Sequence, residues 1–175
     1  MKRIHIIGRK NHGKTTLVFE LVRELQSRGL RVGTIKHTHH HHELDTPGKD
    51  SHLHREAGAV VSGVYSRTMT TVFWPPNEPA NTDAEPSESS DAKYAAFAPM
   101  FSSCDIVIVE GDSHTQATKL EVWRKEVSGS PLAASDATIA VVITDDNVDQ
   151  DMGTPIWPRS DVKAIATKIL QSRTT

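Results

Sequence analysis

The sequence contains little cysteine, few aromatic side chains and almost no net charge. Cys104 is the only cysteine among 175 residues, which excludes an intramolecular disulfide framework and a multi-cysteine zinc or redox site. The 20 Lys and Arg residues against 22 Asp and Glu give a formal net charge of −2. Because no overall basic field is present, we expect no nucleic acid among the partners.

Long apolar runs are missing as well. The apolar run that begins at Ile4 breaks at Gly8, too early for the core of a signal peptide, and no stretch approaches the roughly 20 apolar residues of a membrane span. We therefore expect a cytoplasmic protein without a membrane partner. The length and the 37% hydrophobic content suit one compact core, so residues 1–175 are predicted to form a single domain.

Strand and helix patterns alternate along the chain. A β-branched run at residues 4–7 precedes a helical pattern that ends at Gly29, and a strand follows at 31–36. Continuous apolar runs at 106–109 and 138–144 are typical of buried parallel strands. An amphipathic helix with Ser160 as its N-cap closes the chain. The pattern predicts an α/β fold, a mostly parallel β-sheet with helices on both faces.

The middle of the chain is less regular. A short helix capped by Asp50 or Ser51 is expected to run through Glu56, followed by two strands at 59–65 and 69–74 that can pair as a hairpin. Residues 75–93 are rich in Pro, Ser and acidic residues, and we expect them to form an exposed, mobile acidic loop inserted into the domain. A further helix is expected at 92–101. The alternating strand at 119–123 is expected at a sheet edge, where Trp123 suits a dimer contact.

A phosphate-binding loop is the strongest motif in the sequence. Gly8-Arg-Lys-Asn-His-Gly13-Lys14-Thr15 matches G-x-x-x-x-G-K-[ST] between a strand and a helix, where a P-loop has to be. Its amides surround phosphate, its lysine reaches the β and γ phosphates, and its Thr hydroxyl ligates Mg²⁺. The motif predicts a P-loop NTPase-like fold and nucleotide binding by residues Gly8, Asn11, His12, Gly13, Lys14, Thr15 and Thr16.

Acidic residues at strand ends are the candidates for metal and base contacts. Glu110 follows the buried strand 106–109 and is predicted to hold Mg²⁺ or its water, so that Lys14 and Glu110 are the candidate catalytic residues. Asp45 is a further candidate metal ligand. Asp145, with Asp146 beside it, ends the next apolar strand and is a candidate nucleotide contact, although the absence of an N-K-x-D motif leaves the base open. No residue is an evident general base, which favours slow hydrolysis.

Together with the P-loop, four further segments and one strand resemble a known family. The segments IKHTHH, DTPGKDS, HREAGA and TKLEVWR, with the strand IVIVEG, are similar to the molybdopterin-guanine dinucleotide biosynthesis adaptor family (MobB), from Ile4 to about Arg124. The resemblance implies a homodimer that binds GTP with Mg²⁺ and has weak GTPase activity. It also implies a partner, the guanylyltransferase that attaches GMP to the molybdenum cofactor, and makes molybdopterin a further candidate ligand.

Two segments depart from the family pattern. Its loop usually reads G-x-S-G-S-G-K-T, whereas this chain has Arg9, Lys10, Asn11 and His12, so the loop is bulkier and more basic. After Glu110-Gly111 the family continues with an aromatic residue and a lysine, whereas residues 112–118 here read DSHTQAT. The first departure either tightens the phosphate contacts or narrows the cradle, and the second puts in doubt any role for that segment.

Two other functions use the same loop. The histidine run at 37–42 would suit a metallochaperone-type GTPase that stores nickel or zinc, although a run of solvated histidines is the commoner case. A small-molecule P-loop kinase would need an arginine-bearing lid, for which Arg55, Arg67 and Arg124 are available. Stoichiometric metal binding or phosphoryl transfer to an added acceptor would distinguish these alternatives from an adaptor.

Overall fold

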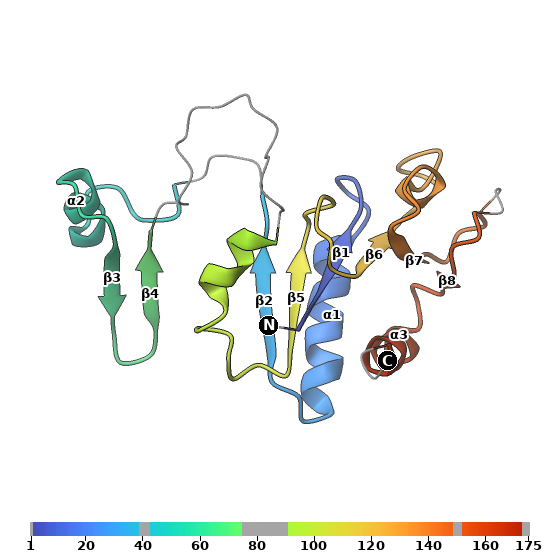
Figure 1. Cartoon of the computed structure of the whole chain (residues 1–175), viewed down its shortest axis with the longest axis horizontal. Helices are drawn as coiled ribbons and strands as arrows, with labels where there is room; N and C mark the ends of the chain where they lie inside the picture. The colour runs from blue at the N-terminus through green and yellow to red at the C-terminus, as the bar shows by residue number, and fades with distance from the viewer. Residues whose placement is uncertain (1, 39–42, 75–90, 149–151, 173–175) are drawn as a thin grey trace. The chain divides into compact units, whose positions relative to one another are not determined.

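The computed structural model describes residues 2–38, 43–74, 91–148 and 152–172 (Figure 1). The chain divides into two compact units, which we call the sheet unit (residues 1–38 with 88–175) and the hairpin unit (residues 39–87). The interpretation of the whole chain as a single domain stays a prediction. In the described part of the chain, no helix has both the length and the apolar character that crossing a membrane requires.

The sheet unit is built on six parallel strands. Their order is β2-β5-β1-β6-β7-β8, and every neighbouring pair is parallel. The strands are β1 (Arg3–Ile7), β2 (Val32–Lys36), β5 (Ile106–Glu110), β6 (Lys119–Val122), β7 (Ile139–Ile143) and β8 (Ile156–Trp157). Because β5 lies between β1 and β2, Glu110 is in register with both Ile6 and Lys36, at the carboxyl edge of the sheet.

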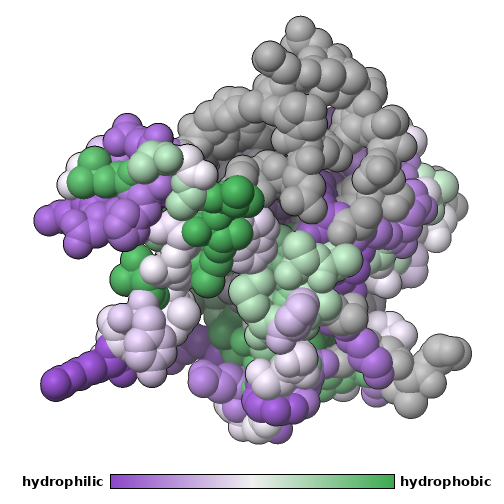
Figure 2. Space-filling view, turned by 60° about the vertical axis from the view of Figure 1, so that its left-hand side comes forward, coloured by the Kyte–Doolittle hydropathy of each residue, from purple (hydrophilic) through white to green (hydrophobic). Residues whose placement is uncertain are grey.

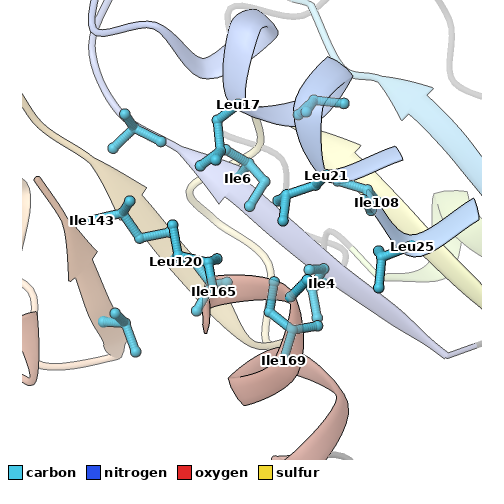
Figure 3. Close-up of a cluster of buried hydrophobic side chains, with 14 of the residues drawn as sticks. Ile4, Ile6, Leu17, Leu21, Leu25, Ile108, Leu120, Ile143, Ile165 and Ile169 are labelled. Carbon is cyan, nitrogen blue, oxygen red and sulfur yellow. The ribbon is translucent and has the colours of Figure 1, made fainter. Parts of the chain in front are cut away.

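Two α-helices cover one face of this sheet. Helix α1 (Lys14–Ser27) and helix α3 (Val162–Gln171) pack their apolar sides against alternate residues of the central strands. Figure 3 shows how Leu17, Leu21 and Leu25 of α1 meet Ile165 and Ile169 of α3 over the strands. Helix α1 ends where Gly29 adopts a φ of +81° and its amide donates to Gln26, a left-handed termination that favours glycine.

The opposite face is covered by 3-10 helices instead. Helix η1 (Ala92–Phe97) places Tyr94 against Val107 and Val109 of β5, and helix η2 (Leu132–Ala134) adds Ala133 to a cluster around Ile7 and Trp123. The predicted α/β fold with helices on both faces is therefore confirmed, with α-helices on one face and short 3-10 helices on the other.

The hairpin unit contains helix α2 (Asp50–Glu56) and two antiparallel strands, β3 (Ser62–Tyr65) and β4 (Thr70–Phe73), so the predicted hairpin is confirmed. Its described part buries almost nothing apolar, since only Asp45 and Ser62 are buried there. Figure 2 shows green, hydrophobic patches on the face turned toward the viewer. The exposed apolar residues of the unit are Leu44, Leu53, Val60, Val61, Val64, Tyr65, Met69 and Val72.

The predicted edge position of the strand at 119–123 is wrong. Strand β6 lies between β1 and β7, all four of its residues are buried, and Trp123 is only 2% exposed. Its charged residues can be buried because each has a partner inside the protein. Lys119 Nζ lies 3.1 Å from Asp136, and the Glu121 carboxylate accepts from the amides of Leu132 and Ala133.

Three element boundaries also differ from the sequence predictions. Asp161 rather than Ser160 caps α3, because its carboxylate accepts from the Ala164 amide at 2.9 Å. Lys49 is the N-cap of α2, which has no side-chain cap. The helix expected at 92–101 is a 3-10 helix that ends at Phe97. Of the expected acidic loop, residues 92 and 93 belong to this helix, Asp91 is its N-cap, and residues 75–90 lie outside the described residues.

Candidate nucleotide-binding site

The loop between β1 and α1 has the backbone of a phosphate cradle. Gly8 has a φ of +137°, and a Cβ atom there would lie 2.4 Å from the Val122 carbonyl oxygen, so both conformation and space require glycine. Gly13 is left-handed as well, with a φ of +88°, and Asn11 has a φ of +68°. The loop therefore holds a conformation that ordinary side chains seldom adopt.

The amino end of α1 is open to an anion. Gly13 is its N-cap, so no side chain accepts hydrogen bonds from the first amides, and the first turn contains no acidic residue. Uncapped amides and the helix dipole together favour a negatively charged ligand at this end. Asn11 and Thr16, two of the predicted contacts, are exposed on either side of it.

The structure brings Thr15 and Glu110 together, as the motif requires. Thr15 Oγ1 donates to Glu110 Oε1 at 2.7 Å, and Lys36 Nζ lies 3.6 Å from the same oxygen. Lys14 Nζ donates to the carbonyl oxygens of Gly8 and Arg9 at 2.7 and 2.8 Å, and burial lowers the pKa of its amine. A hydroxyl and a carboxylate in contact beside an open helix terminus form a suitable pair of oxygen ligands for Mg²⁺.

Two bulky residues of the loop turn away from the cradle. Arg9 Nη1 donates to the Ser130 carbonyl oxygen at 2.6 Å and to Ser128 Oγ at 3.1 Å. The His12 ring is 1% exposed, and its Nδ1 accepts from the Arg124 amide at 2.9 Å. The sequence left two possible effects for the bulky residues of this loop, tighter phosphate contact or a narrower cradle. The Arg9 and His12 side chains have neither effect, because both turn away from the cradle. Any phosphate contact at His12 therefore falls to its backbone.

The other predicted acidic contacts are already engaged. Asp145 Oδ1 accepts hydrogen bonds from both the amide and the hydroxyl of Ser160 at 2.9 Å. The hydrogen bond from the Ser160 amide lowers the pKa of this carboxyl. Asp146 Oδ2 accepts from the Lys125 amide at 2.7 Å. Asp45 belongs to the hairpin unit, where Ser51 Oγ donates to it at 2.8 Å and Arg55 lies 3.3 Å away. Its role as a metal ligand stays a prediction.

A buried polar network below the carboxyl edge was missed from the sequence. His5 is fully buried, with Nδ1 3.2 Å from the Gly111 carbonyl oxygen and Nε2 accepting from Arg3. Tyr94 donates to Asp112 at 2.8 Å, and burial with this bond raises the pKa of the Tyr94 hydroxyl. The network holds the backbone that follows Glu110. Its one sequence signal is His5, a polar residue within a β-branched strand.

The histidine run lies mostly outside the described residues. Positions 39–42 are not described, and the His37 Nε2 atom lies 3.1 Å from Lys93 Nζ. Over the described ranges, no group of three or more His, Cys, Asp or Glu side chains is arranged to hold a metal ion.

The strand order and the loop together define the class of protein. A parallel sheet, a glycine-rich loop leading into an uncapped helix, and an acidic residue on the adjacent strand are the parts of a P-loop NTPase-like fold. The family model described as molybdopterin guanine dinucleotide synthesis protein B matches residues 3–145. The chain belongs to this family.

Individual relatives agree with this assignment. The chain is 31% identical over 161 residues to the molybdopterin-guanine dinucleotide biosynthesis adapter protein of Escherichia coli (strain K12), covering 91% of this chain and 86% of that protein. The Haemophilus influenzae protein of the same name is 31% identical over 139 residues, covering 79% and 72%. A MobB homolog from Bacillus stearothermophilus superposes over the full length of both chains with a TM-score of 0.66 at 23% identity, which supports the fold alone.

Proposed function

We propose that this protein binds GTP with Mg²⁺ at its P-loop, hydrolyses it slowly, and acts as an adapter in molybdopterin guanine dinucleotide synthesis. The observation that carries the proposal is the 2.7 Å contact between Thr15 and Glu110 beside the uncapped end of α1. Family membership supports the biosynthetic role. The expected cytoplasmic location stays a prediction.

The phosphates would bind between the loop amides and Lys14. Lys14 would exchange its bonds with the Gly8 and Arg9 carbonyl oxygens for the β and γ phosphates. Thr15 and Glu110 would hold Mg²⁺, directly or through water, and the bound metal would neutralise charge on the phosphate oxygens. Glu110 already accepts from Thr15 and faces Lys36, so it is poorly placed to act as a base as well. This arrangement favours slow hydrolysis.

The guanine ring of the nucleotide would lie on the other side of the loop, over the carboxyl ends of β6 and β7. Glu110 marks the metal side on β5, and β6 adjoins β1 on the opposite side. Asp146 is better placed than Asp145 to accept from the guanine edge, because Asp145 binds Ser160 through the hydroxyl as well as the amide. Guanine presents N–H donors that a carboxylate accepts, whereas adenine does not present the same pair.

The partners follow from the adapter role. The relatives are named adapter proteins, so we place a guanylyltransferase of the molybdenum cofactor as the partner enzyme and molybdopterin as a further ligand. Homodimer formation would use the hairpin unit, whose apolar side chains are exposed, and not β6, which is an interior strand.

Nucleotide titration by calorimetry tests the proposal. GTP, GDP and ATP with Mg²⁺ are titrated into the wild type, Lys14→Ala and the control Lys10→Ala, which removes an exposed cation from the same loop. We expect guanine-selective binding that Lys14→Ala weakens by about 10- to 100-fold, the scale of hydrogen bonds to a charged group. Lys10→Ala should have a small effect.

A hydrolysis assay on the same samples should give turnover well below about one per second. Preference for ATP, or no nucleotide binding by the wild type, would overturn the proposal. Stoichiometric nickel or zinc binding would support a metallochaperone instead, and phosphoryl transfer to an added acceptor would support a kinase.

A further inference from the structure

The P-loop is attached to the segment that connects β6 to β7, residues 123–138. At its start, Gly8 packs against the Val122 carbonyl oxygen so closely that no Cβ atom would fit. In its middle, Arg9 donates to the Ser130 carbonyl oxygen and to Ser128 Oγ. Near its end, His12 Nδ1 accepts from the Arg124 amide. The Arg9 and His12 contacts hold the loop against residues 123–138, and the Gly8 contact holds it against Val122, the last residue of β6.

That segment is itself held firmly. The Glu121 carboxylate, 1% exposed, accepts from the amides of Leu132 and Ala133 at 2.7 and 2.9 Å, which fixes η2 against the sheet. The Lys125 amide donates to Asp146 after β7. The segment therefore gives the loop a fixed support rather than a second flexible surface.

The His12 contact depends on one particular atom. A backbone amide donates to Nδ1, so this nitrogen carries no proton and the ring is neutral with its proton on Nε2. Nε2 is buried and has no hydrogen-bond partner among the residues that the structure describes. Burial, with the cations Lys14, Arg9 and Arg124 nearby, lowers the pKa of His12 and keeps Nδ1 available as an acceptor. Asn11, the residue directly before His12, has a φ of +68°.

We infer that Arg9 and His12 are positioning residues that fasten the P-loop to the β6–β7 connection and so hold the phosphate cradle in its binding conformation before nucleotide arrives. Both side chains are bonded to residues outside the loop rather than directed into the cradle. A loop that is already ordered loses less conformational entropy on binding, so the attachment strengthens the phosphate part of the affinity. This inference rests on the proposed nucleotide-binding function, whereas its effect on loop mobility can be measured without nucleotide.

Two substitutions of His12 distinguish the loss of the Nδ1 hydrogen-bond acceptor from the loss of the histidine ring. In His12→Asn, the amide oxygen can take the place of Nδ1 and accept from Arg124, whereas in His12→Gln the longer side chain places its oxygen near the position of Nε2. Hydrogen exchange of the free protein should show amides 8–13 and 124–130 exchanging about 10-fold faster in His12→Gln, with near wild-type rates in His12→Asn. Exchange in α3 should be unchanged in both.

Nucleotide affinity provides the second readout. The ratio of GTP to GMP affinity should fall about 10-fold in His12→Gln and stay within about threefold of wild type in His12→Asn. Arg9→Ala, a substitution at an exposed site, should lower the same ratio more than Lys10→Ala, which removes an equal charge from the same loop. A simple stability defect would lower the thermal midpoint and leave the ratio unchanged.

The inference is overturned if the two His12 variants give equal loop exchange rates, or if Lys10→Ala weakens GTP binding as much as Arg9→Ala. If the wild type binds no nucleotide, the proposed function fails, and the exchange measurement still decides whether Arg9 and His12 fasten the loop.

Discussion

His5 and His12 are buried as neutral rings, each because one nitrogen accepts a hydrogen bond. Arg3 Nε donates to His5 Nε2, and the Arg124 amide donates to His12 Nδ1. Protonation would remove both acceptors and place a charge where water cannot solvate it. Burial accordingly lowers both pKa values from the ordinary value of 6.5.

These lowered pKa values predict acid sensitivity. The unfolded chain binds protons near pH 6.5 while the folded protein does not, so the stabilisation is complete above that pH and is lost as pH falls through the lower folded pKa values. Each unit of difference contributes about 1.4 kcal/mol. Urea unfolding between pH 8 and 5 should show the loss. His12→Asn should reduce the loss of stability between pH 8 and 5, whereas His114→Asn, at an exposed site, should leave that loss unchanged.

Glu110 is predicted to couple GTP binding to Mg²⁺. In Glu110→Gln the carboxylate that Thr15 contacts becomes neutral, so the tighter binding that Mg²⁺ provides should fall by about 10-fold, on the scale of one charge-assisted contact. Affinity is measured with Mg²⁺ and with EDTA. Asp105→Asn is the matched control, because Asp105 lies just before the opposite end of the same strand, paired with Arg31. Equal loss in both variants would contradict the role of Glu110.

At the level of elements, the N-cap of α3 shows how geometry decides which of two neighbouring residues caps a helix. Ser160 and Asp161 are both good N-caps by composition. Asp145 engages the amide and the hydroxyl of Ser160 from the end of β7, and Asp161 then accepts from the Ala164 amide. Ser160 thus ties the start of α3 to Asp145 beyond β7, and Asp161 caps the first turn of the helix.

Asp161→Ala should lower the free energy of unfolding by about 1 kcal/mol, because it leaves the Ala164 amide without its acceptor. Chemical denaturation measures the change. The control, Gln171→Ala at an exposed position in the last turn, should alter stability by less than about 0.5 kcal/mol. A change of similar size in both variants would show that the cap contributes nothing specific.

For the whole molecule, the hairpin unit poses the largest energetic problem. Its described part has exposed apolar side chains on α2 and the two strands and no buried apolar cluster, and a two-stranded sheet is marginal on its own. Tyr65 is 89% exposed and Val64 lies beside it. In the proposed homodimer, a second copy of the chain would cover this surface.

The double substitution Val64→Glu with Tyr65→Glu should therefore convert a dimer to a monomer, since carboxylates in an apolar interface lose their hydration. Sedimentation velocity measures the change. Met100→Glu, at a half-exposed apolar site in the sheet unit, is the control and should stay dimeric. The wild type sedimenting as a monomer, or a dimer that survives the double substitution, would contradict this placement of the interface.

The local features of this protein could be predicted from its sequence. The P-loop, the strand and the helix on its two sides, the hairpin and the Gly29 termination all depend on neighbouring residues and their periodicity. The position of β6 could not, because Lys119 and Glu121 are read as surface residues until their partners Asp136 and the η2 amides are known. Those partners are 11 to 17 residues away.

The sequence by itself therefore determined the candidate site of this protein, a P-loop motif with Lys14, Thr15 and an acidic residue at a strand end. Only the tertiary structure decided that β5 enters between β1 and β2 and brings Glu110 to Thr15, and that Arg9 and His12 face the β6–β7 connection. The physical reason is range. Helix, strand and turn preferences act over a few residues, whereas strand order and buried polar partners are settled by competition among contacts across the whole chain.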